Sequence, residues 1–398
     1  MVINMSEYNN VPKIRFKGFT DVWEQRKFEN IFNYERPDKY IVNSTEYLEF
    51  GPTPVLTANK AFILGYTTEK NKYVNSHESI IFDDFTLDTK FVDFPYMVKS
   101  SAIKILTLKD EKKDNIRFNF ELLSNHRFNM LGHARHYISV VQPEEVFTTN
   151  KQEQNKIGEL FTNLDNLITL HQRKCDNLIN VKKSLLEKMF PKNSSNIPEI
   201  RFKGFTDVWE QRKLGEVGYA KSGQGFPDAE QGGTRGIPFY KVSDMNITGN
   251  ENELITANNY VTLEQINKNH WNIINDVPAI FFAKVGAAVM LNRKRLCRKS
   301  FLLDNNTMAY MFDKSKWNYN FGKTLFDTID LTLLAQIGAI PSYNASDVEN
   351  IEILMPHLKE QEKIGKLFTN LDNLITLHQR KLEKLRNIKK SMLDKMFV

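Results

Sequence analysis

The sequence is poor in cysteine and has no long apolar run. Cys175 and Cys297 are its two cysteines among 398 residues, too few for a disulfide framework, so the chain suits a reducing compartment. No stretch approaches the roughly eighteen apolar residues of a membrane span. Residues 1–12 form a polar tail without the basic start and apolar run of a secretion signal. We therefore expect a cytoplasmic protein with no membrane partner.

Catalytic motifs are missing as well. The sequence has no Gly-x-x-x-x-Gly-Lys phosphate loop, no Asn-Pro-Pro-Tyr methyltransfer loop, no His-Glu-x-x-His and no Cys-x-x-Cys. A nuclease-like pairing of Pro37-Asp38 with Glu111–Lys113 joins distant segments, and we attribute it to chance. We expect no catalytic residue and no metal site in this chain. A self-sufficient enzyme stays as an alternative that a cofactor-binding assay tests.

Two repeated segments divide the chain into tandem halves. The first, Arg15–Lys27, returns without a change as Arg201–Lys213; we call it the opening motif. The second, Phe161–Lys174, returns unchanged as Phe368–Lys381. Each half is therefore an opening motif, a long variable stretch and a repeated final segment.

The repeated final segments predict two long helices, at 151–190 and 357–398. Apolar residues recur at alternating steps of three and four, which places a seam along one side of a coiled-coil helix. About forty residues at ~1.5 Å each make a rod of roughly 60 Å. An ordinary core helix is the alternative. The seam residues are Ile157, Phe161, Leu164, Ile168 and His171 in the first helix and Ile364, Phe368, Leu371, Ile375 and His378 in the second.

Two details of these helices extend the prediction. Thr149 to Gln152 has the spacing of a capping box, so the first helix is expected to open there. Leucines outside the seam suggest more burial than one partner helix supplies: a docking surface for other subunits, or packing against neighbouring domains. They are Leu160, Leu167 and Leu170 in the first helix and Leu367, Leu374 and Leu377 in the second.

The variable stretches predict two domains rich in strands, at 13–150 and 199–356, because short apolar runs alternate with polar turns. Helices are expected near 115–131 and 320–334. Pro191 stops the first long helix, and residues 191–198 form a linker. The two variable stretches share little sequence. The fold class is α+β, with two strand-rich α/β domains and two long helices in a tandem repeat.

Basic and amide side chains suggest nucleic-acid binding. Arg293–Lys299 carries five cations, which suit DNA phosphates, and Arg or Asn donors suit base edges. Each stretch alone also fits a solvated loop. The candidate DNA-binding residues are Thr57, Asn59, Lys60, Lys99, Ser100, Arg127, Arg135 and His136 in the first domain, and Lys241, Ser243, Arg293, Lys294, Arg295, Arg298, Lys299, Asn305 and Asn306 in the second.

The arrangement resembles the specificity subunit of type I restriction-modification systems over nearly the whole chain. The helices open with Glu-Gln-x-Lys-Ile-Gly at 153–158 and 360–365, and the opening motif contains Phe-Lys-Gly-Phe-Thr-Asp-x-Trp-Glu-Gln at 16–25 and 202–211. One departure is the lead-in to the first helix, Val146–Gln152, which lacks the Pro-x-Leu-x-Glu-Gln pattern. Segments similar to the family's target-recognition domains are 54–60, 82–86 and 236–244.

This resemblance implies a non-catalytic, sequence-specific subunit that binds double-stranded DNA. Each target-recognition domain would read one half of a bipartite, asymmetric target, while the long helices pair antiparallel about a pseudo-twofold as a spacer. Two modification subunits would methylate adenine with S-adenosylmethionine, and two restriction subunits would cleave DNA with ATP. S-adenosylmethionine, ATP and Mg²⁺ would belong to these partners, and no cofactor to this chain. The rival interpretation is a coiled-coil scaffold that joins proteins without reading nucleic acid.

Overall fold

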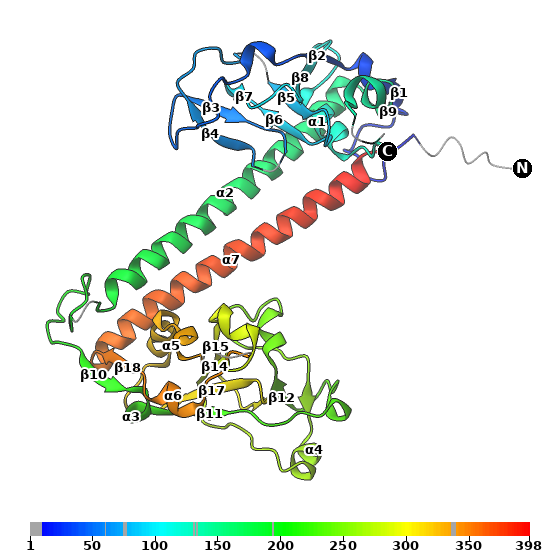
Figure 1. The fold of residues 1–398 in the computed structure, drawn as a ribbon. Coiled ribbons are helices and arrows are strands. Elements are labelled where there is room, and N and C mark those ends of the chain that lie inside the picture. Colours follow the sequence, from blue (N-terminus) through cyan, green and yellow to red (C-terminus); the bar gives the residue numbers. More distant parts are fainter. Residues whose placement is uncertain are drawn as a thin grey trace, which may run out of the picture. The chain divides into compact units, whose positions relative to one another are not determined.

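The computed structural model describes residues 10–398 except 60, 75–77, 130–131, 133, 193–194 and 336–339. The chain forms two compact units. Unit 1 comprises Met1–His171 with Lys381–Val398, and unit 2 comprises Gln172–Arg380. The long helices α2 (Lys151–Met189) and α7 (Leu358–Met396) each contribute one part to each unit (Figure 1).

Unit 1 builds its variable domain from two sheets. A four-stranded sheet has the order β2-β8-β5-β6, and a three-stranded sheet has the order β4-β3-β7. Strands β1 and β9 form a separate antiparallel pair. The elements are β1 (Glu24–Lys27), β2 (Phe32–Glu35), β3 (Thr53–Leu56), β4 (Ile63–Thr67), β5 (Ser79–Asp83), β6 (Thr89–Val92), β7 (Met97–Val98), β8 (Ile103–Leu108), α1 (Ile116–Asn125) and β9 (Glu145–Thr148).

Unit 2 repeats this plan. Its sheets have the orders β11-β17-β14-β15 and β13-β12-β16, and β10 pairs with β18. The elements are β10 (Glu210–Lys213), α3 (Leu214–Val217), β11 (Gly218–Ser222), β12 (Ile237–Tyr240), β13 (Tyr260–Val261), α4 (Leu263–Lys268), β14 (Ala279–Ala283), β15 (Lys294–Cys297), β16 (Leu302–Leu303), β17 (Thr307–Phe312), α5 (Tyr319–Thr328), α6 (Ala345–Glu349) and β18 (Glu352–Met355).

The two variable domains therefore share one topology although their sequences differ. In each, a central strand pairs antiparallel with one neighbour and parallel with the other: β3 with β4 and β7, β12 with β13 and β16. The middle strands β5 and β14 are buried at every residue. A run of buried apolar residues suffices to place such a strand in a sheet core, whatever its identities.

The opening motif docks onto the start of the long helix in each unit. Arg15 donates two hydrogen bonds to the buried Glu153 carboxylate, at 2.8 and 2.7 Å. Arg201 binds Glu360 in the same way at 2.7 and 2.8 Å. Burial alone would raise the pKa of Glu153, but the hydrogen bonds from Arg15 and Thr149 outweigh it and hold that pKa below its usual value.

A buried glutamine beside each of these carboxylates ties the variable domain to the helix. The Gln154 Oε1 accepts from the Asn115 backbone N–H at 2.8 Å, and its amide donates to the Thr149 carbonyl at 2.7 Å. Gln361 repeats this with the Asn318 N–H at 2.9 Å and the Pro356 carbonyl at 2.9 Å. Helix α1 in the first domain and helix α5 in the second thereby begin against the long helix.

The glycine of the repeated Ile-Gly pair permits this close approach. A Cβ at Gly158 would lie 2.6 Å from the Asn115 Oδ1, and one at Gly365 would lie 2.6 Å from the Phe321 backbone nitrogen. Those neighbours belong to the N-terminal caps of α1 and α5, since the Asn115 and Asn318 side chains accept from the first-turn N–H groups.

Each junction is closed by the end of the other long helix. In unit 1, Phe397 lies 6.2 Å from the Trp23 ring and 5.3 Å from the Phe118 ring. In unit 2, Phe190 lies 5.8 Å from the rings of both Trp209 and Phe321. Aromatic side chains at these distances bury much of the junction's apolar area.

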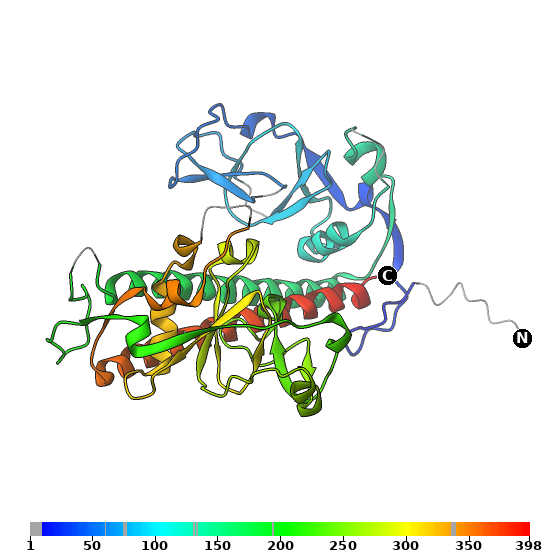
Figure 2. The same cartoon turned by 60° about the horizontal axis from the view of Figure 1, so that its bottom comes forward.

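The two long helices run antiparallel within each unit, side by side in both views (Figures 1 and 2). In unit 1 Phe161 contacts Phe397 and Asp165 pairs with Lys389, so numbers rise along one helix as they fall along the other. In unit 2 Lys182 pairs with Asp372 and Phe190 contacts Phe368.

The seam predicted for these helices divides into buried and half-buried positions. Ile157, Phe161, Leu164 and their counterparts Ile364, Phe368 and Leu371 are buried. The half-buried positions are Ile168, His171, Ile375 and His378.

The start of α2 differs in detail from the expectation. The Asn150 side chain accepts from the Glu153 N–H at 3.0 Å, so Asn150 is the capping residue. The Thr149 hydroxyl instead donates to the Glu153 side chain. Glu153 is already bound by Arg15, and Thr149 supplies a further hydrogen bond to the same carboxylate.

Helices α1 and α5 of the variable domains are shorter than the sequence suggested. Helix α1 ends at Asn125 and α5 ends at Thr328, where we expected 131 and 334.

Among the described residues, no helix is long and apolar enough to cross a membrane.

We expect Gln154→Ala to destabilise the chain by about 1–3 kcal/mol, because it leaves the buried Asn115 N–H and Thr149 carbonyl without partners. Urea unfolding followed by tryptophan fluorescence measures the loss. The matched control is Gln152→Ala, an exposed glutamine on the same helical turn, which should change stability by less than about 0.5 kcal/mol. Equal effects of the two substitutions would contradict the role assigned to Gln154.

Candidate nucleic-acid interface

The carboxyl ends of three strands meet in each variable domain. In the first domain, β3 and β7 are parallel neighbours, and the Lys99 N–H donates to the Leu56 carbonyl at 3.1 Å. The residues after these strands, Thr57–Asn59 and Lys99–Ser100, therefore lie together. The end of β5 joins them, since the Asn59 amide donates to the Asp83 carboxylate at 3.2 Å. We call Thr57, Asn59, Asp83, Lys99 and Ser100 cluster 1.

Hydrogen bonds fix the geometry of cluster 1. The Asp83 carboxylate accepts from the backbone N–H groups of Phe85 and Thr86 at 2.9 and 3.0 Å. The Thr57 hydroxyl donates to the Asn59 Oδ1 at 3.0 Å. Thr57 is itself buried, whereas Lys99 is exposed. Thr57 thus positions Asn59 rather than facing solvent as the sequence suggested.

A buried ion pair lies beside cluster 1. The Lys104 Nζ is 2.9 Å from the Asp84 carboxylate, and both side chains are buried. Asp84 also accepts from the Tyr137 N–H at 2.8 Å, which holds the chain at 135–137. The exposed Arg135 reaches the Ser101 carbonyl at 3.4 Å and lies over the Phe85 ring at 5.8 Å. Arg135 is therefore brought to the edge of cluster 1.

Two predicted residues of the first domain, His136 and Arg127, do not join this surface. His136 is buried, with its Nδ1 3.2 Å from the Asp84 carbonyl, because the backbone bond to Asp84 draws it inward. Arg127 is exposed but follows the end of α1, where its neighbour His126 contacts Phe28 and Glu144. Lys60 lies outside the described residues.

The second domain forms the equivalent cluster with other side chains. Strands β12 and β16 are parallel, and the Asp304 N–H donates to the Tyr240 carbonyl at 3.0 Å. The end of β14 joins them, as the Lys284 N–H donates to the Asn306 carbonyl at 2.9 Å. Cluster 2 comprises Lys241, Ser243, Lys284, Asp304, Asn305 and Asn306.

Cluster 2 is also held from within. The Lys241 Nζ donates to the Gln231 side chain at 3.0 Å, and the Asn306 N–H donates to the Asp304 carboxylate at 3.2 Å. Burial raises the pKa of Asp304, and the hydrogen bond from Asn306 opposes that rise only in part. Asn305 and Asn306 are exposed, so two amides face outward from a fixed turn.

The two clusters present different hydrogen-bonding groups in the same topological place. Cluster 1 offers the Asn59 amide and the exposed Lys99, and cluster 2 offers two exposed amides and two lysines, whereas the Asp83 and Asp304 carboxylates are buried and hold the turns in place. Asn pairs with adenine in the major groove, and Lys with guanine. The arrangement can therefore discriminate base edges differently in each domain. The sequence did not single out Lys284 or Asp304, although each directly follows a strand, and it marked Asp83, the last residue of β5, only as part of the segment 82–86.

The basic segment Arg293–Lys299 is a strand and not the loop we expected. It contains the edge strand β15, paired with β14. Lys294 is 3% exposed, and its Nζ donates to the Asn292 Oδ1 at 2.7 Å and the Ile329 carbonyl at 2.5 Å. Lys294 is therefore not a DNA contact. Arg298 is exposed and ion-paired with Glu253 at 2.9 Å.

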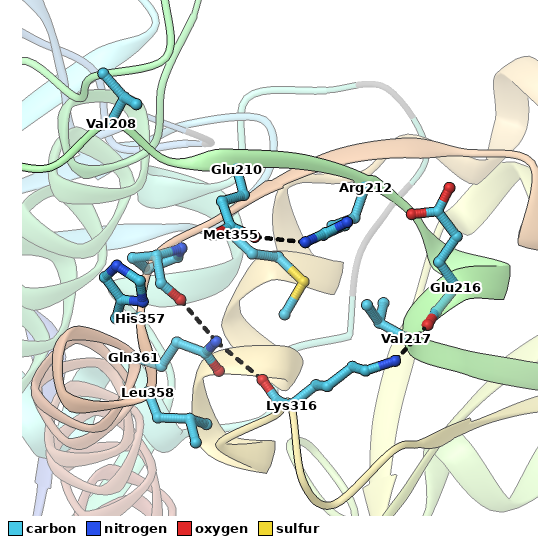
Figure 3. A pocket seen from close by; sticks show the side chains of 11 residues that line it. Val208, Glu210, Arg212, Glu216, Val217, Lys316, Met355, His357, Leu358 and Gln361 are labelled. Atoms are coloured by element: carbon cyan, nitrogen blue, oxygen red, sulfur yellow. Dashed lines mark hydrogen bonds and ion pairs between the residues drawn. The ribbon is translucent and has the colours of Figure 1, made fainter.

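A pocket at each junction is lined by the opening motif. In unit 2 it measures about 530 Å³, and Figure 3 shows Gln361 at its floor, donating to the Lys316 carbonyl. Arg212 and Glu210 pair across its rim at 2.7 Å (Figure 3). A smaller pocket of about 350 Å³ lies at the matching place in unit 1, lined by Glu24 among others. Both pockets are therefore formed by the segments that the two halves of the chain repeat.

The described residues contain no group of three or more His, Cys, Asp or Glu side chains arranged to hold a metal ion. The paired seam histidines, His171 and His378, are half-buried along the long helices.

Comparisons with known proteins agree on one family. Residues 206–387 match the family model of the type I restriction modification DNA specificity domain. The chain is 26% identical to the EcoR124I/EcoR124II type I restriction enzyme specificity subunit of Escherichia coli, over 86% of this chain and 85% of that protein. It is 23% identical to the MjaVIII specificity subunit of Methanocaldococcus jannaschii, over 61% and 59%.

The fold is also found among solved structures. The crystal structure of a type I restriction-modification S subunit from M. genitalium matches with a TM-score of 0.66 and 16% identity, over 98% of this chain and 99% of that one. A second structure, of a type I restriction-modification complex, matches with a TM-score of 0.50 and 13% identity, over 94% and 97%.

We predict that the burial of Lys294 shows in the pH dependence of stability. Burial lowers its pKa to about 8 from 10.5, so between these values the unfolded chain binds the proton that the folded chain has lost. Stability contributed by this group should therefore rise from about pH 8 to pH 10.5. Urea unfolding across this range should give a steeper rise for the wild type than for Lys294→Met. Parallel curves would show that Lys294 titrates as an exposed lysine does.

Proposed function

We propose that this chain, which belongs to the family of type I restriction-modification specificity subunits, binds double-stranded DNA and reads a bipartite, asymmetric target. The observation that carries the proposal is the pair of variable domains, equal in topology and unlike in their strand-end clusters. Equal topology supports an equivalent approach to DNA. Unlike side chains support two different half-sites, since base edges are distinguished by their donors and acceptors.

The long helices support a fixed gap between the half-sites. Each has 39 residues, which makes a rod of ~58 Å. That length exceeds one DNA turn of about 34–36 Å. We therefore expect two short motifs separated by base pairs that this chain does not read, with the helices setting their number.

The repeated segments support partners that bind in two copies. Packing explains identical residues on the seam, but not identical residues in solvent. Leu167 and Leu170 on α2 are 44% and 46% exposed, and their counterparts Leu374 and Leu377 on α7 are 44% and 46% exposed. Two equal apolar surfaces, one in each unit, suit two identical modification subunits. The repeated segments therefore give the surface two equal docking sites.

The chemistry is assigned to those partners. Two modification subunits methylate adenine with S-adenosylmethionine, and two restriction subunits use ATP and Mg²⁺ to cleave unmodified DNA. This chain selects the site and takes no part in bond making. We expect the complex in the cytoplasm, together with the DNA it surveys.

The first test is to map N6-methyladenine in cells that carry the modification subunit, with and without this chain. We expect methylation only with the chain, at two short motifs a fixed distance apart. Asn59→Ala should relax one half-motif and Asn305→Ala the other, because a lost base contact costs about 1–3 kcal/mol of discrimination. Each variant serves as the control for the other.

An intact complex that produces no methylation at any motif would favour a scaffold that joins proteins without reading DNA. A gel shift of the purified complex on total genomic fragments would then decide between a scaffold and a DNA-binding subunit. A variant in one domain that changed both half-motifs would contradict the division of labour between the domains.

The docking surfaces are tested by stoichiometry. Leu167→Glu with Leu170→Glu should reduce the bound modification subunits from two to one, measured by native mass spectrometry, because a charge replaces apolar contact. Leu374→Glu with Leu377→Glu should do the same, and all four changes together should leave none. The control is Ile179→Glu, an exposed apolar residue of α2 at 43% exposure whose counterpart in α7 is Arg386. Retention of both subunits by the fourfold variant would exclude these surfaces.

A further inference from the structure

A pocket separate from cluster 2 lies where the last turns of α2 meet the second variable domain. It measures about 580 Å³. Its walls come from α2, the segment after it, the edge strand β15 and helix α5, all within unit 2 (Figure 1). Its charged lining comprises seven cations and three carboxylates: Lys182, Lys183, Lys192, Arg293, Lys294, Arg295 and Lys323, with Glu187, Glu251 and Asp327.

Part of this charge is balanced inside the protein. The Asp327 carboxylate is 3.4 Å from the Lys182 Nζ and 2.6 Å from the Lys323 Nζ. Lys182 also pairs with Asp372 at 2.6 Å. Burial alone would raise the pKa of Asp327, but Lys323 and Lys182 outweigh it and lower that pKa. This network forms a neutral floor that joins α2, α5 and α7.

The five remaining cations outnumber the two remaining carboxylates of the lining, Glu187 and Glu251. Arg293 donates to the neutral Asn246 side chain at 2.7 Å, and Arg295 donates to the Lys294 carbonyl at 2.9 Å. The Nε atoms of both arginines are buried and lack a hydrogen-bond partner. Burial, and next the charge of Arg293, lower the pKa of Arg295. Across the described residues, no ion pair engages either arginine, Lys183 or Lys192.

Uncompensated cations around a cavity indicate an anionic ligand, because burying charge without a partner costs free energy that a bound anion returns. The lining also indicates which anion. None of the described residues that line the pocket is aromatic, so it offers no platform on which a free nucleotide's base would stack. Exposed Lys183 and Lys192 stand at positions open to solvent, as contacts to a long polyanion require.

We propose that this pocket binds backbone phosphates of DNA and ties the duplex to α2 beside the second recognition domain. The inference rests on the proposed DNA-reading function and adds a site to it. Phosphate contacts fix register and orientation without reading sequence. Lys183 on α2, Lys192 just after it, and the arginines at the start of β15 hold one stretch of backbone, so the spacer helix and the second domain engage DNA together.

Among the described residues, this arrangement of cations is found in the second half of the chain and not in the first. The counterpart of β15 in the first domain is β6, whose sequence Thr-Lys-Phe-Val carries one cation. The α7 counterparts of Lys182 and Lys183 are Lys389 and Lys390. Lys389 is paired with Glu121 and Asp165 much as Lys182 is paired with Asp327 and Asp372, so the difference between the halves lies in β15 and β6. The second half of the target therefore contributes more of the salt dependence of binding than the first.

The test measures DNA affinity of the complex against salt concentration by fluorescence anisotropy. Lys183→Gln and Lys192→Gln should each reduce the slope of log affinity against log salt by about 0.9, and the double variant by about twice that. The preference for target over unrelated DNA should stay unchanged. The matched control is Lys390→Gln, an exposed lysine at the equivalent position of α7, which should leave the slope at its wild-type value.

Each other outcome is decisive. Wild-type slopes in the double variant, with target preference intact, would overturn the pocket but not the proposed function. If the wild-type complex shows no preference for target over unrelated DNA, the proposed function is overturned instead. An equal fall in slope for Lys390→Gln would remove the asymmetry. If ATP binds the wild type and not the double variant while the DNA slope stays unchanged, the pocket is a free-nucleotide site.

Discussion

The structure depends on a small buried polar contact at the start of each long helix. A glutamate held by two arginine hydrogen bonds stands next to a glutamine that bonds the backbone of the variable domain. Because these groups are buried, an alternative docking of the domain would leave them unpaired at a cost of about 1–3 kcal/mol for each group. The contact therefore specifies orientation. Apolar burial around Trp23 and Trp209 supplies most of the stabilisation but less directional information.

The residues that dock each variable domain on the long helix are separate from its strand-end cluster, so the variable domains can change while the junctions stay the same. The residues that meet the long helix are repeated in both halves, whereas the strand ends that carry clusters 1 and 2 face elsewhere. Asn59 and Asp83, at the ends of β3 and β5, occupy in one domain the place that Lys241 and Lys284, at the ends of β12 and β14, occupy in the other. New side chains at those strand ends leave the helix junction intact, so recognition is free to vary without loss of the fold.

The long helices and the docking of the opening motif were predictable from sequence, because their signals are local and repeated. The heptad spacing predicted the long helices, and the exact return of the opening motif predicted equivalent docking. The shared topology of the domains was not predictable in this way, since strands as short as β5 and β14, although both buried throughout, carry too few residues to identify them as equivalent. Their pairing depends on contacts between segments far apart in the chain.

The candidate site was predictable only in part for the same reason. Thr57, Lys99 and Lys241 were chosen as polar and basic side chains, and the structure places them at strand ends, but composition alone does not say which side of a strand a charge occupies. Lys294 stands in a dense basic segment, yet the alternation along β15 turns it inward. His136 is drawn inward by Asp84, a partner fifty-two positions away, which no local pattern reveals.

The closing of unit 1 by Phe397 has a consequence for synthesis. Chains emerge from the ribosome N-terminus first, and domains generally fold as they emerge. Unit 1 holds the first residues of the chain but also needs Lys381–Val398. Its junction around Trp23, Phe118 and Phe161 thus stays open while all of unit 2 is made. The unit that is translated first is the one completed last, and its apolar junction is exposed to chaperones and to other nascent chains until then.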